Sequence, residues 1–203
     1  MKKIYFLISA LFFLGLGTGK AQYTQLLNFN GPNGAEPFGT LIANANNTVL
    51  YGTAYLGGVT HDSGCIFSIH ADGSNYKVLL DFTGPNGIGP NSPLTLIGGK
   101  LFGSANTGGA NDSGLIFSMD TNGGGFKDLF DFSGPNGKNP YNNLVFDSNS
   151  GILYGIADGG LNHIGVLFSV DTSGGGYRDL YDFTIATGEY PLGLTLVANK
   201  FYG

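Results

Sequence analysis

Residues 29–34 read Phe-Asn-Gly-Pro-Asn-Gly, and the pattern returns as Phe-Thr-Gly-Pro-Asn-Gly at 82–87 and Phe-Ser-Gly-Pro-Asn-Gly at 132–137. A degenerate fourth copy, Phe-Thr-Ile-Ala-Thr-Gly, occupies residues 183–188. The leading phenylalanines are 53, 50 and 51 residues apart. Self-similarity at a period of about fifty residues is the signature of a repeat architecture. One structural unit is therefore expected to occur several times along the chain.

Two further markers recur in the same phase. An aromatic residue followed by glycine stands at 51–52, 102–103, 154–155 and 202–203. The pattern Gly-x-φ-Phe-Ser, with φ an apolar residue, begins at Gly64, Gly114 and Gly165. Agreement in phase among three separate markers makes a chance resemblance between the units untenable.

Each unit has the pattern of a four-stranded meander. In the first unit the predicted strands are residues 38–43, 49–55, 65–70 and 76–82, each rich in aromatic and branched side chains and bounded by Gly, Asn or Asp. Gly98-Gly99 between two apolar runs predicts a two-residue hairpin. Runs such as Leu-Ile-Phe at 115–117 are apolar on consecutive positions, so both faces of the sheet must be covered.

Repeated antiparallel sheets covered on both faces are typical of blades arranged around an axis. A linear stack of β-units is the alternative. The ring is favoured because residues 23–29 match only the fourth strand of a unit, which is what the last blade of a ring needs to close without an exposed edge. We therefore predict an all-β protein, a β-propeller built of four-stranded antiparallel blades that is incomplete in this chain.

The repeat domain is predicted to span residues 22–203. A leading outer strand is placed at 23–29, complete blades at about 38–82, 91–132 and 141–183, and a partial blade at 192–203. Because the last unit stops just inside its second strand, we expect the sequence to be a fragment of a longer reading frame.

Residues 1–21 have the features of a secretory signal peptide. Lys2 and Lys3 precede an apolar run at 4–16, and the small residues Gly19 and Ala21 stand before the expected cleavage point. The apolar run is too short for a stable membrane anchor, and no later segment is long and apolar enough for one. We expect a secreted or cell-surface protein with no transmembrane anchor in this chain.

Charge and cysteine content narrow the possible partners. Loss of residues 1–21 removes three of nine basic residues and none of fourteen acidic ones, which leaves a net charge of about −8. Nucleic-acid binders gather Lys and Arg on one face to release counterions, so a nucleic-acid partner is not expected. Cys65 is the single cysteine, excludes an intrachain disulfide, and replaces Leu115 and Val166 of the sibling units, so a buried apolar role is predicted.

Function is expected on the face that carries the longer loops, because rigid scaffolds place their binding residues on loops. In the loop between strands two and three, polar residues occupy equivalent places in three units, which are His61 and Asp62, Asn111 and Asp112, and Asn162 and His163. In one interpretation these six residues bind a glycan or a protein ligand. In the other, Asn and Asp satisfy the backbone of the turn. No metal site and no cofactor are predicted.

No catalytic residue is predicted, because the sequence has no Gly-x-Ser-x-Gly elbow, phosphate loop or His-Glu-x-x-His segment. Asp81, Asp131 and Asp182 precede the marker phenylalanines in every unit, which indicates a hydrogen bond within each blade. The alternative to a binding module is a propeller enzyme acting on a polysaccharide, of the glycoside hydrolase or lyase type. Its carboxylates would come from non-repeated acids such as Glu36 or Glu189.

The combined pattern resembles the GloVer tandem repeat of exported bacterial proteins. It is carried by residues 50–82, 101–132 and 153–183, where Leu-(Tyr/Phe)-Gly is followed by Gly-x-φ-Phe-Ser and by Leu-x-Asp-Phe or its variants. The resemblance implies a propeller-like array that is secreted or attached to the cell surface, often with a C-terminal anchoring segment, and it implies no common activity. The expected function is that of an exported repeat scaffold or binding module at the bacterial cell surface.

Overall fold

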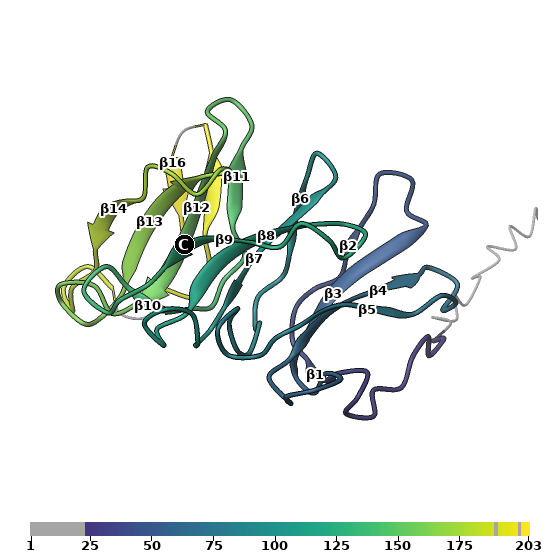
Figure 1. The fold of residues 1–203 in the computed structure, drawn as a ribbon. Coiled ribbons are helices and arrows are strands. Elements are labelled where there is room, and N and C mark those ends of the chain that lie inside the picture. Colours follow the sequence, from purple (N-terminus) through teal and green to yellow (C-terminus); the bar gives the residue numbers. More distant parts are fainter. Residues whose placement is uncertain (1–22, 189–190, 199) are drawn as a thin grey trace, which may run out of the picture.

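The computed structural model describes residues 23–203 except 189–190 and 199, and this part of the chain is all β. The predicted signal peptide at 1–21 lies outside the described residues. The sheets follow one another in chain order, from blue through teal to green in Figure 1. No membrane-spanning helix occurs in the described part of the chain.

Three blades and a two-stranded unit make up the fold. Blade 1 holds β1 (Ala35–Pro37), β2 (Ile42–Ala43), β3 (Val49–Leu56), β4 (Cys65–His70) and β5 (Lys77–Asp81). Blade 2 holds β6 (Thr95–Ile97), β7 (Lys100–Ala105), β8 (Leu115–Asp120) and β9 (Lys127–Asp131). Blade 3 holds β10 (Lys138–Pro140), β11 (Val145–Asp147), β12 (Ile152–Asp158), β13 (Val166–Asp171) and β14 (Arg178–Asp182), and β15 (Thr195–Val197) pairs with β16 (Lys200–Tyr202) in the last unit.

The innermost strand of a blade is broken into two pieces. In blade 1, β1 pairs with the end of β3 and β2 with its beginning, while the residues between β1 and β2 leave the ladder. Blade 3 repeats the arrangement with β10 and β11 on β12. The first strand predicted at 38–43 is therefore shorter and interrupted.

The four units share an axis. A cavity of about 490 Å³ is lined by the innermost strands β2, β6, β11 and β15 and the residues beside them. Strands from every unit would not border one cavity in a linear stack. The prediction of blades arranged around an axis is confirmed.

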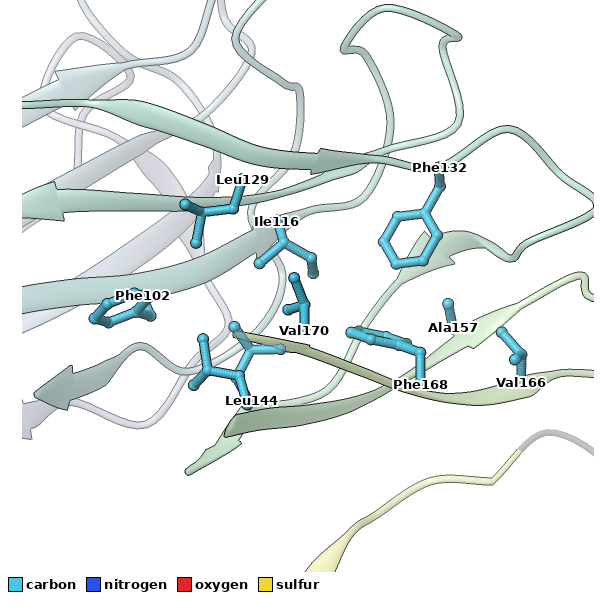
Figure 2. Packing of buried hydrophobic residues seen from close by; sticks show 10 residues of the cluster. Phe102, Ile116, Leu129, Phe132, Leu144, Ala157, Val166, Phe168 and Val170 are labelled. Carbon is cyan, nitrogen blue, oxygen red and sulfur yellow. The ribbon is translucent and has the colours of Figure 1, made fainter. Parts of the chain in front are cut away.

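The hydrophobic core lies between the blades. Figure 2 shows Phe102, Ile116 and Phe132 of blade 2 facing Leu144 and Phe168 of blade 3. A second cluster joins blade 1 to blade 2. On β8, Ile116 belongs to the cluster with blade 3 whereas Leu115 and Phe117 belong to the cluster with blade 1. Consecutive apolar residues thus serve two cores, which explains the pattern seen in the sequence.

The aromatic-glycine marker has a steric explanation. Gly103 on β7 pairs with Phe117 on β8, and a Cβ on that glycine would lie 2.6 Å from the Phe117 ring. Gly52 and Phe67 repeat the pair in blade 1. Cys65 is fully buried as predicted, and burial raises the pKa of its thiol to about 11.

Residues 23–29 are not assigned to a strand, although an outer strand was predicted there. They nevertheless pack on blade 1 as β5 packs on blade 2. The Phe29 and Phe67 rings lie 5.3 Å apart, and the Phe82 and Phe117 rings 5.6 Å apart, both edge to face. In each blade the outermost strand pairs with the third strand of the same blade, and among the described residues no such strand pairs with residues 23–29.

Candidate functional site

The longer loops gather on one face of the blades. The loop after strand two is hydrogen-bonded to the Gly-Pro-Asn-Gly turn of the preceding unit, through Gly58 N to Gly31 O at 2.9 Å in blade 1. Gly109 N to Gly84 O and Gly160 N to Gly134 O repeat the bond at 3.0 and 3.1 Å. We call the surface formed by residues 57–64, 108–114 and 159–165 the loop face.

An aspartate that recurs at the end of the outermost strand of each blade fixes these loops. Asp81 accepts hydrogen bonds from the amides of Val59 and Thr60, each at 2.9 Å, and from the Thr60 hydroxyl at 2.6 Å. Asp131 accepts from Ala110 N, and Asp182 from Leu161 N, both at 2.7 Å. The blade-level hydrogen bond predicted from the recurrence of these aspartates is confirmed.

The glycine before each bonded amide is required for this contact. A Cβ at Gly58, Gly109 or Gly160 would collide with Oδ1 of the aspartate of the same blade. All three glycines have positive φ, a conformation that other residues adopt at a cost. The second glycine of the recurring Gly-Gly pair is therefore part of the loop anchor.

Blades 2 and 3 carry a second aspartate beside the first. β9 has a bulge at Leu129, since Asp128 pairs with Phe117 while Phe130 pairs with Ile116. Side chains alternate along a strand, so the extra residue places Asp128 and Asp131 on one side. Burial, followed by a hydrogen bond to the Asp131 side chain and the charge of Asp131, raises the pKa of Asp128 to about 6.

The Asp128 and Asp131 pair borders a cavity of about 330 Å³ on the loop face. Its walls include Pro85, Gly109 and Asp112, and no Lys, Arg or His is among its lining residues.

Blade 3 repeats the pair and blade 1 does not. In blade 3, burial and then Asp182 raise the pKa of Asp179. Blade 1 has Val78 at the equivalent position, which pairs with Phe67 as Asp128 pairs with Phe117. The second aspartate was not identified from the sequence, since a spacing of three residues places two side chains on opposite faces of a regular strand. Only the bulge brings them together.

The six residues predicted to bind a ligand are all exposed. Four of them use their side chains within the scaffold. Asp62 and Asp112 accept hydrogen bonds from Gly57 N at 2.7 Å and Gly108 N at 3.2 Å. Asn111 and Asn162 donate to the carbonyls of Phe132 and Phe183, both at 3.0 Å. These bonds stabilise the loops. Ligand binding by the six residues stays a prediction.

The two histidines are held less firmly. His61 Nδ1 lies 2.5 Å from the Thr60 hydroxyl, and His163 has a left-handed backbone with φ of 59°. Among the described residues no group of three His, Cys, Asp or Glu side chains is arranged to hold a metal ion. Glu36 is exposed on β1, and Glu189 lies outside the described residues.

Comparison with solved structures identifies the class of fold. A chain in the crystal structure of a nidogen/laminin complex matches with a TM-score of 0.53 and 18% identity, over 82% of this chain and 70% of that one. TolB from Acinetobacter baumannii matches with a TM-score of 0.51 and 16% identity, over 81% of this chain but only 35% of the TolB chain. At these identities the likeness shows the propeller fold alone.

Comparison of sequences identifies the family. No curated protein matches the chain. The sequence model of one family, described as the Gloeobacter/Verrucomicrobia repeat, matches residues 9–203. The match spans all the blades, and it agrees with the resemblance read from the recurring motifs. The chain belongs to the Gloeobacter/Verrucomicrobia repeat family, with an all-β fold of propeller blades.

Proposed function

We propose that this repeat scaffold is an exported binding module that takes a glycan or protein ligand on its loop face at the bacterial cell surface. The observation that carries the proposal is the anchoring of three equivalent loops by Asp81, Asp131 and Asp182. A binding surface gains affinity when its loops are ordered before the ligand arrives. Each anchored loop exposes two polar residues at equivalent places.

Export is supported by the sequence. Basic residues, a short apolar run and small residues near position 21 are typical of a signal peptide. A net charge of about −8 without residues 1–21 disfavours nucleic acid as the ligand. The exposed hydroxyl, amide, imidazole and carboxylate groups of the loop face suit the polar surface of a glycan or of another protein.

The test compares ligand binding by two variants of residues 22–203. His61→Ala combined with His163→Ala removes exposed side chains that no loop amide depends on. Asn149→Ala, on the hairpin between β11 and β12 at the opposite end of the blade, is the matched control. On a glycan array and in a pull-down of proteins from the cell envelope, we expect the double variant to lose binding that the control retains.

Two outcomes would refute the proposal. One is binding that is equal in the double variant and the unaltered chain. The other is an absence of both glycan and protein binding, which leaves a scaffold without a ligand. Hydrolysis or cleavage of a polysaccharide that is lost in Glu36→Gln or Glu189→Gln would instead assign the protein to the enzyme class.

A further inference from the structure

The outermost strand of blade 3 presents side chains at the positions that blades 1 and 2 use to hold the following blade. In blade 2 these are Lys127, Leu129, Phe130 and Phe132, and in blade 3 they are Arg178, Leu180, Tyr181 and Phe183. Leu129 is 6% exposed and Phe132 is fully buried, whereas Leu180 and Tyr181 are 42% and 43% exposed. We call the four residues of blade 3 the outer face.

The structure shows what covers such a face. On blade 2 it is the third strand and the following glycine hairpin of blade 3. The Phe130 and Tyr177 rings stack at 3.8 Å with an angle of 2°, and the Phe132 and Phe168 rings meet edge to face at 5.2 Å. The hairpin glycine Gly174 lies against the Leu129 backbone so closely that a Cβ would sit 2.7 Å from the Leu129 carbonyl oxygen.

A basic side chain fixes the hairpin in each junction. Lys127 Nζ donates to the carbonyl of Ser173 at 2.6 Å, and Lys77 Nζ donates to the carbonyl of Asn122 at 3.3 Å. Arg178 occupies the corresponding position in blade 3. A guanidinium can donate the same hydrogen bond to a hairpin carbonyl.

The outer face is already arranged to receive this occupant. The Tyr181 and Phe183 rings lie 5.2 Å apart at 82°, as the Phe130 and Phe132 rings lie 5.2 Å apart at 87°. Beside Tyr181 and Phe183 is a cavity of about 520 Å³ that Leu192 and Phe201 also line. Where blade 1 meets blade 2, the corresponding place is filled by Phe117 from the third strand of blade 2. Where blade 2 meets blade 3, it is filled by Phe168 from the third strand of blade 3.

We propose that the outer face of blade 3 is a docking surface for a β-hairpin of this same repeat, with the sequence pattern Gly-x-φ-Phe-Ser-φ-Asp-x-Ser-Gly-Gly-Gly-Tyr. The hairpin phenylalanine enters the cavity, its tyrosine stacks on Tyr181, and a carbonyl of its turn accepts a hydrogen bond from Arg178. The proposal is independent of ligand binding on the loop face, because none of these residues belongs to that face.

The experiment uses the repeat's own hairpin as the probe. A fluorescein-labelled peptide with the sequence of residues 165–177 is titrated into residues 22–203, and binding is followed by fluorescence anisotropy. We expect saturable binding that Tyr181→Ser weakens about tenfold or more, as is usual for a central aromatic anchor. Val59→Ser, an exposed apolar residue of the loop face, is the control and should bind as the unaltered chain does.

A second peptide tests the phenylalanine. The same sequence with Phe168→Ala should bind at least about tenfold more weakly, since it cannot fill the cavity. Circular dichroism verifies that Tyr181→Ser is folded. The proposal is overturned by absence of saturable binding, by equal binding to Tyr181→Ser and Val59→Ser, or by equal binding of the two peptides. Self-association of the whole chain through Tyr181 without peptide binding would also overturn it, in favour of a different occupant.

Discussion

The glycine of the second strand leaves no space for a larger residue. A Cβ on Gly103 would lie 2.6 Å from Phe117, a fully buried ring that also contacts Phe82 and Phe126. We expect Gly103→Ala to lower the free energy of unfolding by about 1–3 kcal/mol, the usual cost of overpacking a core. Urea denaturation measures the change.

Gly124→Ala is the matched control for this substitution. Gly124 lies in the exposed hairpin between β8 and β9 with an ordinary φ, and its nearest neighbour to an added Cβ is the Asn122 side chain at 3.3 Å. Its stability should change by less than about 0.5 kcal/mol. A Gly103→Ala protein as stable as Gly124→Ala would show that the Phe117 ring moves aside without cost.

The Asp128 carboxyl predicts a dependence of stability on pH. Its pKa is raised to about 6 in the folded protein, so the folded state holds the proton more tightly than the unfolded state. The free energy of unfolding therefore falls as the pH rises from about 4 to about 6. Since Asp128 is exposed on β9, solvent screening reduces the expected loss to about 1 kcal/mol or less.

Asp128→Val tests this contribution with a residue that the protein itself uses, since Val78 stands at the same place in blade 1. The variant should be more stable than the unaltered chain at pH 7 and should lose part of the decline between pH 4 and pH 6. Urea midpoints at the two pH values provide the measurement. An unchanged decline would assign the pH dependence to other carboxyl groups, such as Asp179, whose pKa is also raised.

At the scale of the element, the loop anchors differ in strength between blades. Asp81 accepts two backbone amides and one hydroxyl, whereas Asp182 accepts one backbone amide, that of Leu161. Removal of a charged acceptor leaves its donors unsatisfied at about 1–3 kcal/mol. We expect Asp81→Ala to accelerate amide hydrogen exchange at Val59 and Thr60 and to lower the free energy of unfolding by about that amount.

Asp182→Ala, with fewer bonds to lose, should have the smaller effect on stability. Asp81→Asn keeps an oxygen acceptor and should restore much of the protection at Val59. Equal exchange rates at Val59 in Asp81→Ala and the unaltered chain would mean that the loop is ordered by its bond to Gly31 instead.

The strands were predictable from the sequence to differing degrees. The hairpin at Gly98-Gly99 is found as expected, with both glycines at positive φ and Ile97 paired with Lys100. Here local chemistry is sufficient, because two adjacent glycines suit a two-residue turn. The break between β1 and β2 and the bulge at Leu129 were missed, since both arise from packing between strands that no local pattern records.

The candidate site was predictable only in part for the same reason. Recurrence identified Asp81 and its equivalents, because a residue needed in every blade repeats with the period. Asp128 repeats only in blade 3, and its role depends on the bulge. The loop residues such as Asn111 were located correctly on the exposed loops, but the hydrogen bond from Asn111 to Phe132 O joins residues twenty-one positions apart and has no sequence signal.

For the molecule as a whole, each blade depends on its neighbour, since the core lies between sheets and not within one. A repeat protein of this kind gains its stability from the interfaces between adjacent units. The ring contact of Phe29 with Phe67 joins residues 23–29 to blade 1, as the contact of Phe82 with Phe117 joins blade 1 to blade 2. Equivalent contacts at the two positions allow a direct comparison of their energies.

We expect Phe82→Ala to lower the free energy of unfolding by about 3–5 kcal/mol, because Phe82 is fully buried between two blades and its removal leaves a cavity. Phe29 is only partly buried, and Phe29→Ala should cost about half as much. Amide hydrogen exchange shows which strands each substitution destabilises. Phe29→Ala should accelerate amide exchange in β4 alone, whereas Phe82→Ala should accelerate it in both β4 and β8. Equal costs for the two variants, with β8 exposed in each, would show that residues 23–29 stabilise the whole array as strongly as a complete blade does.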